Sequence, residues 1–112
     1  MELLVITLKD NEEFLRTLSG LKDHGMNGVV LPCTSLRHAL LNNNVDAAPA
    51  FGGLSKVVDH HFDASHTVFM LINKERLEEA KAVVHSIAKN LEGKGVMFSM
   101  PVTFFEGLKN KE

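Results

Sequence analysis

One stretch of the sequence decides the fold: residues 66–100 read HTVFMLINKERLEEAKAVVHSIAKNLEGKGVMFSM. Residues 66–72 form a short run of apolar and β-branched side chains, which predicts a strand. Asn73 is a residue type that caps helices, and apolar side chains then recur at every third or fourth position, so the pattern predicts an amphipathic helix that ends at Gly93. Residues 96–100 are a second strand candidate, which a proline ends. The stretch therefore predicts a strand, a helix and a strand in that order.

The N-terminal part of the chain repeats this order. Residues 3–8 are almost wholly apolar over a length that suits a strand covered on both faces. Asp10 or Asn11 then caps a helix with apolar side chains at helical spacing, and Gly25 ends that helix. Residues 28–31 predict a second strand, which the proline after them stops or moves to a sheet edge.

Two strand-helix-strand units predict an α+β, ferredoxin-like βαββαβ fold, in which a four-stranded antiparallel sheet carries both helices on one face. The length of 112 residues fits a single domain over residues 1–112. A long connection, residues 34–64, separates the second and third strands, and connections of this length are usually functional or disordered. Because the first strand is apolar on both sides, we expect another copy of the chain to cover the face that the helices leave open.

The composition limits the possible partners. Apolar residues make up 45% of the chain and the net charge is -2, so the chain is globular in character and has no electrostatic basis for binding nucleic acid. Trp and Tyr are absent, which removes most side chains that stack on bases. No run of about 18 apolar residues occurs, so we expect no membrane insertion. The single cysteine, Cys33, excludes an internal disulfide and favours a reducing compartment, the cytoplasm.

Two glycine motifs carry a resemblance to a known family. Residues 25–28, Gly-Met-Asn-Gly, resemble the Gly-x-x-Gly turn between the first helix and second strand of the PII signalling proteins. Residues 93–102, Gly-Lys-Gly-Val-Met-Phe-Ser-Met-Pro-Val, resemble the segment that ends the second helix and forms the last strand of that family. The order and size of the elements agree over nearly the whole chain. The chain therefore resembles a divergent PII-like protein.

This resemblance implies a regulatory protein of signal transduction, as in nitrogen regulation, rather than an enzyme. PII proteins are homotrimers that bind ATP, ADP and a small effector in clefts between subunits. Their long mobile loop, which corresponds here to residues 34–64, then engages a target protein. The implied partners are further copies of this chain, a small-molecule ligand and a target protein.

The candidate ligand-binding residues lie at three places along the chain. They are Thr34, Ser35 and Arg37 at the start of the loop, Gly93, Lys94 and Gly95 at the turn before the last strand, and Lys109 near the C-terminus. The glycine-rich turn and Lys109 follow from the resemblance, whereas Arg37 is a basic residue beside the loop that could meet an anion, with ordinary surface charge as the alternative. Backbone N–H groups of such a glycine-rich turn suit a phosphate. The family's phosphate-binding lysine falls on Val96, so Lys94 is the basic residue of this turn. The ligand stays open between an adenine nucleotide, ATP or ADP, and another metabolite.

A second hypothesis is a metal-binding trimer, similar to the cation-tolerance proteins that share this fold. The densest set of metal-ligating side chains is His60, His61, Asp63 and His66. Imidazole and carboxylate groups suit divalent zinc, copper or nickel. In a strand, His60 and His66 would share one side, and His61 and Asp63 the other. The spacing matches no established zinc motif, so histidines on a solvated loop are the alternative interpretation.

No constellation for catalysis stands out in the sequence. Cys33 and His38 lie five residues apart, but a lone cysteine beside a strand is more often a small buried residue than a nucleophile. No Asp or Glu is near enough in sequence to complete a triad, and we expect no enzymatic activity. Phe104 and Phe105 are expected to pack, either over the core or across a boundary between subunits.

Overall fold

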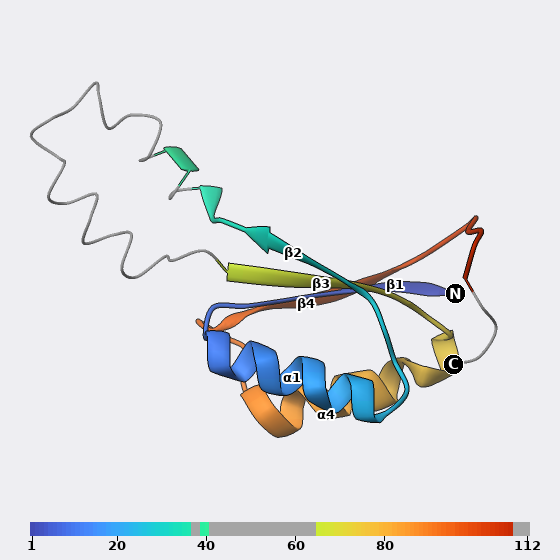
Figure 1. The fold of residues 1–112 in the computed structure, drawn as a ribbon, viewed down its shortest axis with the longest axis horizontal. Coiled ribbons are helices and arrows are strands. Elements are labelled where there is room, and N and C mark those ends of the chain that lie inside the picture. Colours follow the sequence, from blue (N-terminus) through green and yellow to red (C-terminus); the bar gives the residue numbers. More distant parts are fainter. Residues whose placement is uncertain (37–38, 41–64, 109–112) are drawn as a thin grey trace, which may run out of the picture.

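The computed structural model describes residues 1–36, 39–40 and 65–108. Its elements, in chain order, are β1 (Glu2–Leu8), α1 (Asn11–Asp23), β2 (Val29–Cys33), β3 (Ser65–Ile72), the short 3-10 helix η2 (Lys74–Arg76), α4 (Leu77–Ala88) and β4 (Gly95–Pro101) (Figure 1). Both strand-helix-strand units that the sequence predicts are present. Most of the predicted connection between β2 and β3 lies outside the described residues.

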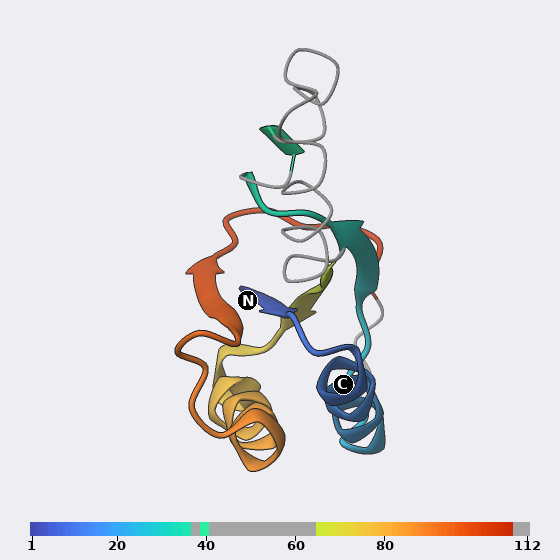
Figure 2. The same cartoon turned by 90° about the vertical axis from the view of Figure 1, so that its left-hand side faces the viewer.

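The four strands form one antiparallel sheet in the order β2-β3-β1-β4. In the central strand β1, Val5 pairs with Phe69 of β3 on one side and with Phe98 of β4 on the other. Both helices lie on the same face of this sheet, as the end-on view in Figure 2 shows. The structure confirms the α+β class and the ferredoxin-like arrangement.

The hydrophobic core fills the space between the sheet and the helices. Leu4, Ile6 and Leu8 of β1 are buried on this side, because successive side chains of a strand point to opposite faces. Phe14 of α1 and Val84 of α4 close the core from the helix layer. Among the described residues, no helix has the length and apolar character needed to cross a bilayer.

The ends of α1 follow the signals in the sequence. The Asp10 carboxylate accepts a hydrogen bond from the backbone N–H of Glu13 at 3.0 Å, so Asp10 rather than Asn11 is the N-cap. At the other end, Gly25 has a φ of 77°, a left-handed conformation that favours glycine. This turn brings the chain from α1 into β2.

The end of β2 and the start of the second helix differ from the prediction. The sheet order confirms that β2 is an edge strand, one of the two outcomes that the proline predicts. The strand is not stopped before Pro32 but continues to Cys33, because an edge tolerates a residue without an N–H. Asn73 makes no capping hydrogen bond with its side chain. Its carbonyl instead accepts from the N–H of Arg76 at 2.9 Å, which forms η2 before α4 begins.

The end of α4 also differs from the prediction. The helix ends at Ala88, well before Gly93, and Lys89 follows with a φ of 58°. The Asn90 side chain then accepts a hydrogen bond from the N–H of Glu92 at 3.0 Å. Such a local turn competes with helical hydrogen bonding, which explains why the helix stops early.

The face of the sheet away from the helices is called the open face below. By strand alternation its side chains are Leu3, Val5, Thr7, Val29, Leu31, Cys33, Thr67, Phe69, Leu71, Val96, Phe98 and Met100. Phe104 and Phe105, which follow β4, are 74% and 43% exposed and do not belong to the core. The expectation that they pack over the core of their own chain is therefore wrong, and a boundary between subunits stays a prediction.

Candidate functional site

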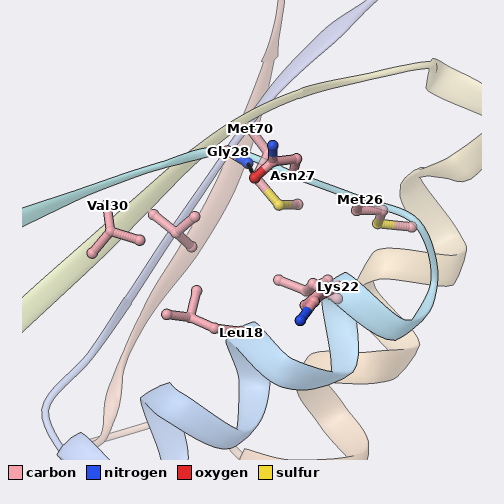
Figure 3. Close-up of a pocket in the computed structure, with 9 residues that line it drawn as sticks. Leu18, Lys22, Met26, Asn27, Gly28, Val30 and Met70 are labelled. Atoms are coloured by element: carbon pink, nitrogen blue, oxygen red, sulfur yellow. Dashed lines mark hydrogen bonds between the residues drawn. The ribbon is translucent and has the colours of Figure 1, made fainter. Parts of the chain in front are cut away.

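A groove between the C-terminal half of α1 and β2 is one hollow of the surface (Figure 3). Its volume is about 450 Å³ and its lining residues are Leu18, Leu21, Lys22, Met26, Asn27, Gly28, Val30, Val68 and Met70. The Asn27 side chain already accepts a hydrogen bond from the N–H of Gly28 at 2.8 Å. Because nearly all the remaining groups are apolar, the groove is the exposed margin of the core and offers little to orient a polar ligand.

A second hollow is called the polar pocket below, after the hydroxyl, thiol and ammonium groups among its lining residues; the rest of its surface is mainly apolar. Its volume is about 360 Å³ and it is lined by Thr7, Lys9, Cys33, Thr34, Ser35, Gly93, Gly95 and Val96. These residues come from the end of β1, the end of β2 and the start of β4. Segments far apart in the sequence therefore place hydroxyl, thiol and ammonium groups around one space, which makes the polar pocket the candidate site.

A row of hydrogen bonds links three strands at the base of the polar pocket. The hydroxyl oxygens of Thr7 and Thr67 lie 2.7 Å apart, and the Thr67 hydroxyl lies 3.0 Å from the Cys33 sulfur. Thr67 is buried, whereas Thr7 and Cys33 are half-buried and line the pocket. Because a hydroxyl is both a donor and an acceptor, this row can adapt its hydrogen bonds to a ligand without moving the strands.

The turn before β4 uses its backbone differently from a phosphate-binding turn. The N–H groups of Lys94 and Gly95 both donate to the carbonyl of Leu91, at 2.8 and 3.0 Å. The Lys94 carbonyl in turn accepts from the N–H of Lys9 at 2.9 Å. These two amides are engaged inside the turn, so the polar pocket presents mainly side-chain groups to a ligand.

Lys94 belongs to a neighbouring hollow rather than to the polar pocket. Its ammonium lies 3.6 Å from the Glu13 carboxylate and 3.3 Å from the carbonyl of Ala88. The neighbouring hollow, of about 300 Å³, is lined by Lys9, Asp10, Glu13, Gly93 and Lys94. Lys9 lines both spaces and is therefore the cationic side chain that borders the polar pocket.

The structure thus brings together four of the predicted ligand-binding residues: Thr34, Ser35, Gly93 and Gly95. Lys94 lies beside them, and Arg37 and Lys109 fall outside the described residues. Sequence reasoning missed Thr7 and Lys9 as members of the site. The signal was present, because Thr7 is the polar residue within the otherwise apolar stretch of β1 from Leu3 to Leu8.

The predicted metal ligands are placed only in part. His66 lies on β3 and its ring stacks on Phe14, with the ring centroids 5.6 Å apart and the planes at 26°. His60, His61 and Asp63 lie outside the described residues. Within the part of the chain that the structure describes, no group of three or more His, Cys, Asp or Glu side chains is arranged to hold a metal ion.

Perturbed electrostatics occur away from the polar pocket, where the end of α1 meets the start of α4. The pKa of the Glu79 carboxyl is lowered because it accepts hydrogen bonds from the Arg76 guanidinium and from His24. The guanidinium also donates to the carbonyl of His24. This cluster of Arg76, Glu79 and His24, called the clasp below, joins the end of α1 to the start of α4 on the surface.

Comparison with known proteins supports the fold and leaves the function open. No family model matches the sequence, and the search of curated proteins gives no match. Among solved structures, the chain is similar to a functionally unknown protein from Pediococcus pentosaceus, with a TM-score of 0.60 and 14% sequence identity. The alignment covers 96% of this chain and 97% of that one, so the whole architecture is shared.

Proposed function

We propose that this chain is a PII-like regulatory protein that binds a small polar ligand in the polar pocket. The observation that carries the proposal is the position of Thr34 and Ser35. Both line the polar pocket, and both stand where β2 ends and the long connection to β3 begins. A ligand in the pocket would therefore contact the start of the connection directly. Binding is proposed to change this connection, which then acts on a target protein.

The lining of the polar pocket favours an anionic or hydroxyl-rich ligand. Thr7, Thr34 and Ser35 supply hydroxyl groups, and Lys9 supplies a positive charge at the rim. Such groups suit a phosphate or a carboxylate, since charge-assisted hydrogen bonds are stronger than neutral ones. The ligand is proposed to be either the phosphate part of an adenine nucleotide or a small acidic metabolite.

Assembly as a homotrimer is part of this proposal. Val96, on the margin of the polar pocket, is 54% exposed, and the pocket opens on the open face of the sheet. A second copy against that face would add a wall to the pocket. The ligand site would then lie between subunits.

The proposal also sets an energetic condition. A ligand shifts a conformational equilibrium only as far as its affinities for the two conformations differ. The ligand must therefore bind more tightly to one arrangement of the connection than to another. Hydrogen exchange of residues 36–64, measured with and without ligand, reports whether the ligand shifts this equilibrium.

Calorimetry and hydrogen exchange with ATP, ADP, inorganic phosphate and a set of dicarboxylates test the proposal. We expect at least one of these probes to bind and to alter exchange in residues 36–64. Replacing Thr34→Val should weaken that binding by about tenfold, the cost of one well-formed hydrogen bond to a charged group. Thr103→Val is the matched control, since Thr103 is exposed and lies outside the pocket. Equal binding by the two variants, or no binding of any probe, would overturn the proposal.

A further inference from the structure

The edge strand β2 extends beyond the helix layer. Val68 and Met70 of β3 point to the helix side of the sheet and are each 2% exposed, because they pack in the core beneath the helices. Val30 of β2 pairs with Val68 and points to the same side, yet it is 42% exposed. The groove of about 450 Å³ between α1 and β2, called the α1–β2 groove below, is therefore an apolar space that the helices leave uncovered (Figure 3).

The base of the α1–β2 groove is apolar and adaptable. The side chains of Met26 and Met70 are buried and line it, with Leu18 of α1 and Val30 of β2 on its two sides (Figure 3). Methionine side chains have three rotatable bonds and a polarizable sulfur, so they adjust to the shape of an apolar ligand. The volume of the groove lies within the range of small-molecule sites. A flexible aliphatic chain therefore suits this base.

Two polar side chains lie at one end of the α1–β2 groove, where the turn leads from α1 into β2. Lys22 is the charged residue among the lining residues that the structure describes, and within those described ranges its ammonium has no carboxylate partner. The Asn27 side-chain carbonyl accepts a hydrogen bond from the N–H of Gly28 at 2.8 Å, so the NH₂ group of Asn27 is left to donate to a ligand. One ammonium and one amide donor therefore border the apolar base at the same end.

The charge and the length of the α1–β2 groove favour a carboxylate with an apolar chain of medium length. A carboxylate carries a single charge and two acceptor oxygens, which match one ammonium and one amide donor. A phosphate monoester carries nearly two charges, whereas the described lining residues offer a single cation. The four residues from Leu18 to Lys22 rise about 6 Å along α1, so the walls cover a medium-length chain and not a full lipid tail.

We propose that the α1–β2 groove binds a medium-chain aliphatic carboxylate. The carboxylate accepts hydrogen bonds from Lys22 and Asn27, and the chain lies over Met70 toward Leu18 and Val30. This second site goes beyond the proposed function, because the α1–β2 groove and the polar pocket share no lining residue. The α1–β2 groove is on the helix side of the sheet, so the ligand does not compete with an assembly through the open face.

Nuclear magnetic resonance of the ¹⁵N-labelled full chain locates the site and measures weak affinities. The probes are butanoate, hexanoate and octanoate, each below the concentration at which it forms micelles. We expect shifts of the backbone amides of residues 18–30 and 68–70 and of the Asn27 side-chain amide. The dissociation constant should fall about two- to fourfold for each CH₂ added, according to how fully the groove buries it.

Two pairs of variants test the head group and the chain separately. Lys22→Gln should raise the dissociation constant of octanoate about three- to fivefold, the effect of an exposed ion pair. Arg16→Gln is its control, since Arg16 is exposed on the same helix and does not line the groove. Val30→Phe fills the groove from a half-exposed strand position and should raise the constant more than tenfold, whereas Leu15→Phe on α1 should leave it unchanged. The amide spectrum of each variant confirms its fold.

Several outcomes would overturn the inference. Equal affinities for butanoate and octanoate, or shifts confined to the polar pocket or the open face, would exclude a carboxylate in the α1–β2 groove. Binding of the chain to phosphatidylglycerol vesicles without binding of free octanoate would make the groove a membrane contact. An oligomer of the wild type that Val30→Phe dissociates in native mass spectrometry would make a second copy the occupant. Thr34→Val should bind octanoate as the wild type does, so failure of the polar-pocket proposal is distinguishable from failure of this one.

Discussion

The hydroxyl oxygens of Thr7 and Thr67 lie 2.7 Å apart across the paired strands β1 and β3. They occupy positions on the open face where the neighbouring pair along the strands, Val5 and Phe69, is apolar. The Thr67 hydroxyl is shared further with the Cys33 sulfur at 3.0 Å, so one buried side chain connects three strands. The polar pocket is therefore built on a hydrogen-bonded base and not on a chance gathering of surface groups.

Replacing Thr67→Val should remove this base without changing the volume of the side chain by much. Both hydrogen bonds of the hydroxyl are lost, and we expect the free energy of unfolding to fall by about 1 kcal/mol. Urea denaturation measures the change, and the exposed Thr103→Val serves as control. A stability equal to that of the wild type would show that the row of hydrogen bonds has no net effect.

In both glycine motifs, the two glycines are required for different physical reasons. In each motif the first glycine, Gly25 or Gly93, has a φ of 77°, and a Cβ atom there would meet no atom within 4 Å. The second glycine packs against a neighbouring strand. A Cβ on Gly28 would lie 2.4 Å from the carbonyl oxygen of Phe69, and a Cβ on Gly95 would lie 2.0 Å from that of Thr7. The first position requires glycine because its backbone is left-handed. The second requires glycine because the neighbouring backbone leaves no space for a side chain.

Substitution at Gly93 and Gly95 should separate these two causes. Gly95→Ala forces a backbone shift between β4 and β1, and we expect it to cost about 3 kcal/mol, at the upper end of overpacking substitutions. Gly93→Asn should cost under about 1 kcal/mol, because asparagine tolerates the left-handed conformation and the space is empty. Thermal unfolding of the two variants measures the difference. A larger loss for Gly93→Asn than for Gly95→Ala would contradict the geometry.

The fold could be predicted from the sequence because its signals are local and repeated. The apolar run of β1, the cap at Asp10 and the glycine at Gly25 each follow from side-chain chemistry within a few residues. The end of α4 could not be placed, because the turn of Asn90 competes with a helix whose apolar pattern continues to Leu91. Such a competition is decided by backbone hydrogen bonds that the apolar pattern does not encode.

The candidate site was predictable only where it coincided with a motif. Gly93 and Gly95 belong to the glycine-rich turn. Thr34 and Ser35 directly follow the predicted second strand, at the start of the long connection. Thr7 could be assigned to the site only with the sheet order, which sets β1 between β3 and β4. The direction of the Lys94 side chain toward Glu13 likewise depends on the packing of α1 beside the turn, and sequence distance gives no measure of it.

The clasp between the helices should make the stability of the fold depend on pH in the acidic range. The Nδ1 atom of His24 lies 2.7 Å from the Glu79 carboxylate, and Arg76 donates to the same carboxylate at 3.2 Å. The lowered pKa of Glu79 means that the folded state favours the ionised form. The resulting stability is fully present above the ordinary value of 4.5 and is lost as the pH falls through the lower folded value.

Glu79→Gln should therefore lower the Tm at pH 7 and lower it by less at pH 3, because the wild-type carboxyl loses its charge as the pH falls through its lowered folded-state pKa. Thermal unfolding followed by circular dichroism measures the difference in Tm between the wild type and the variant at each pH. Glu106→Gln is the control, since Glu106 is exposed and its replacement should leave the Tm unchanged. If the difference in Tm between the wild type and Glu79→Gln is as large at pH 3 as at pH 7, the effect comes from packing and not from charge.

The ring of His66 stacks on Phe14 at a centroid distance of 5.6 Å, so its observed contact is that of an aromatic side chain at the margin of the core. His66→Phe keeps this stacking, and we expect the free energy of unfolding to stay within about 1 kcal/mol of the wild type. His66→Ala removes the ring and should cost more than His66→Phe in the same urea titration. If stacking is the role of this residue, zinc uptake by the chain, measured by calorimetry, should be equal in the wild type and in His66→Phe. A loss of zinc binding in His66→Phe at unchanged stability would instead make His66 a metal ligand and favour the metal-binding hypothesis over the ligand sensor.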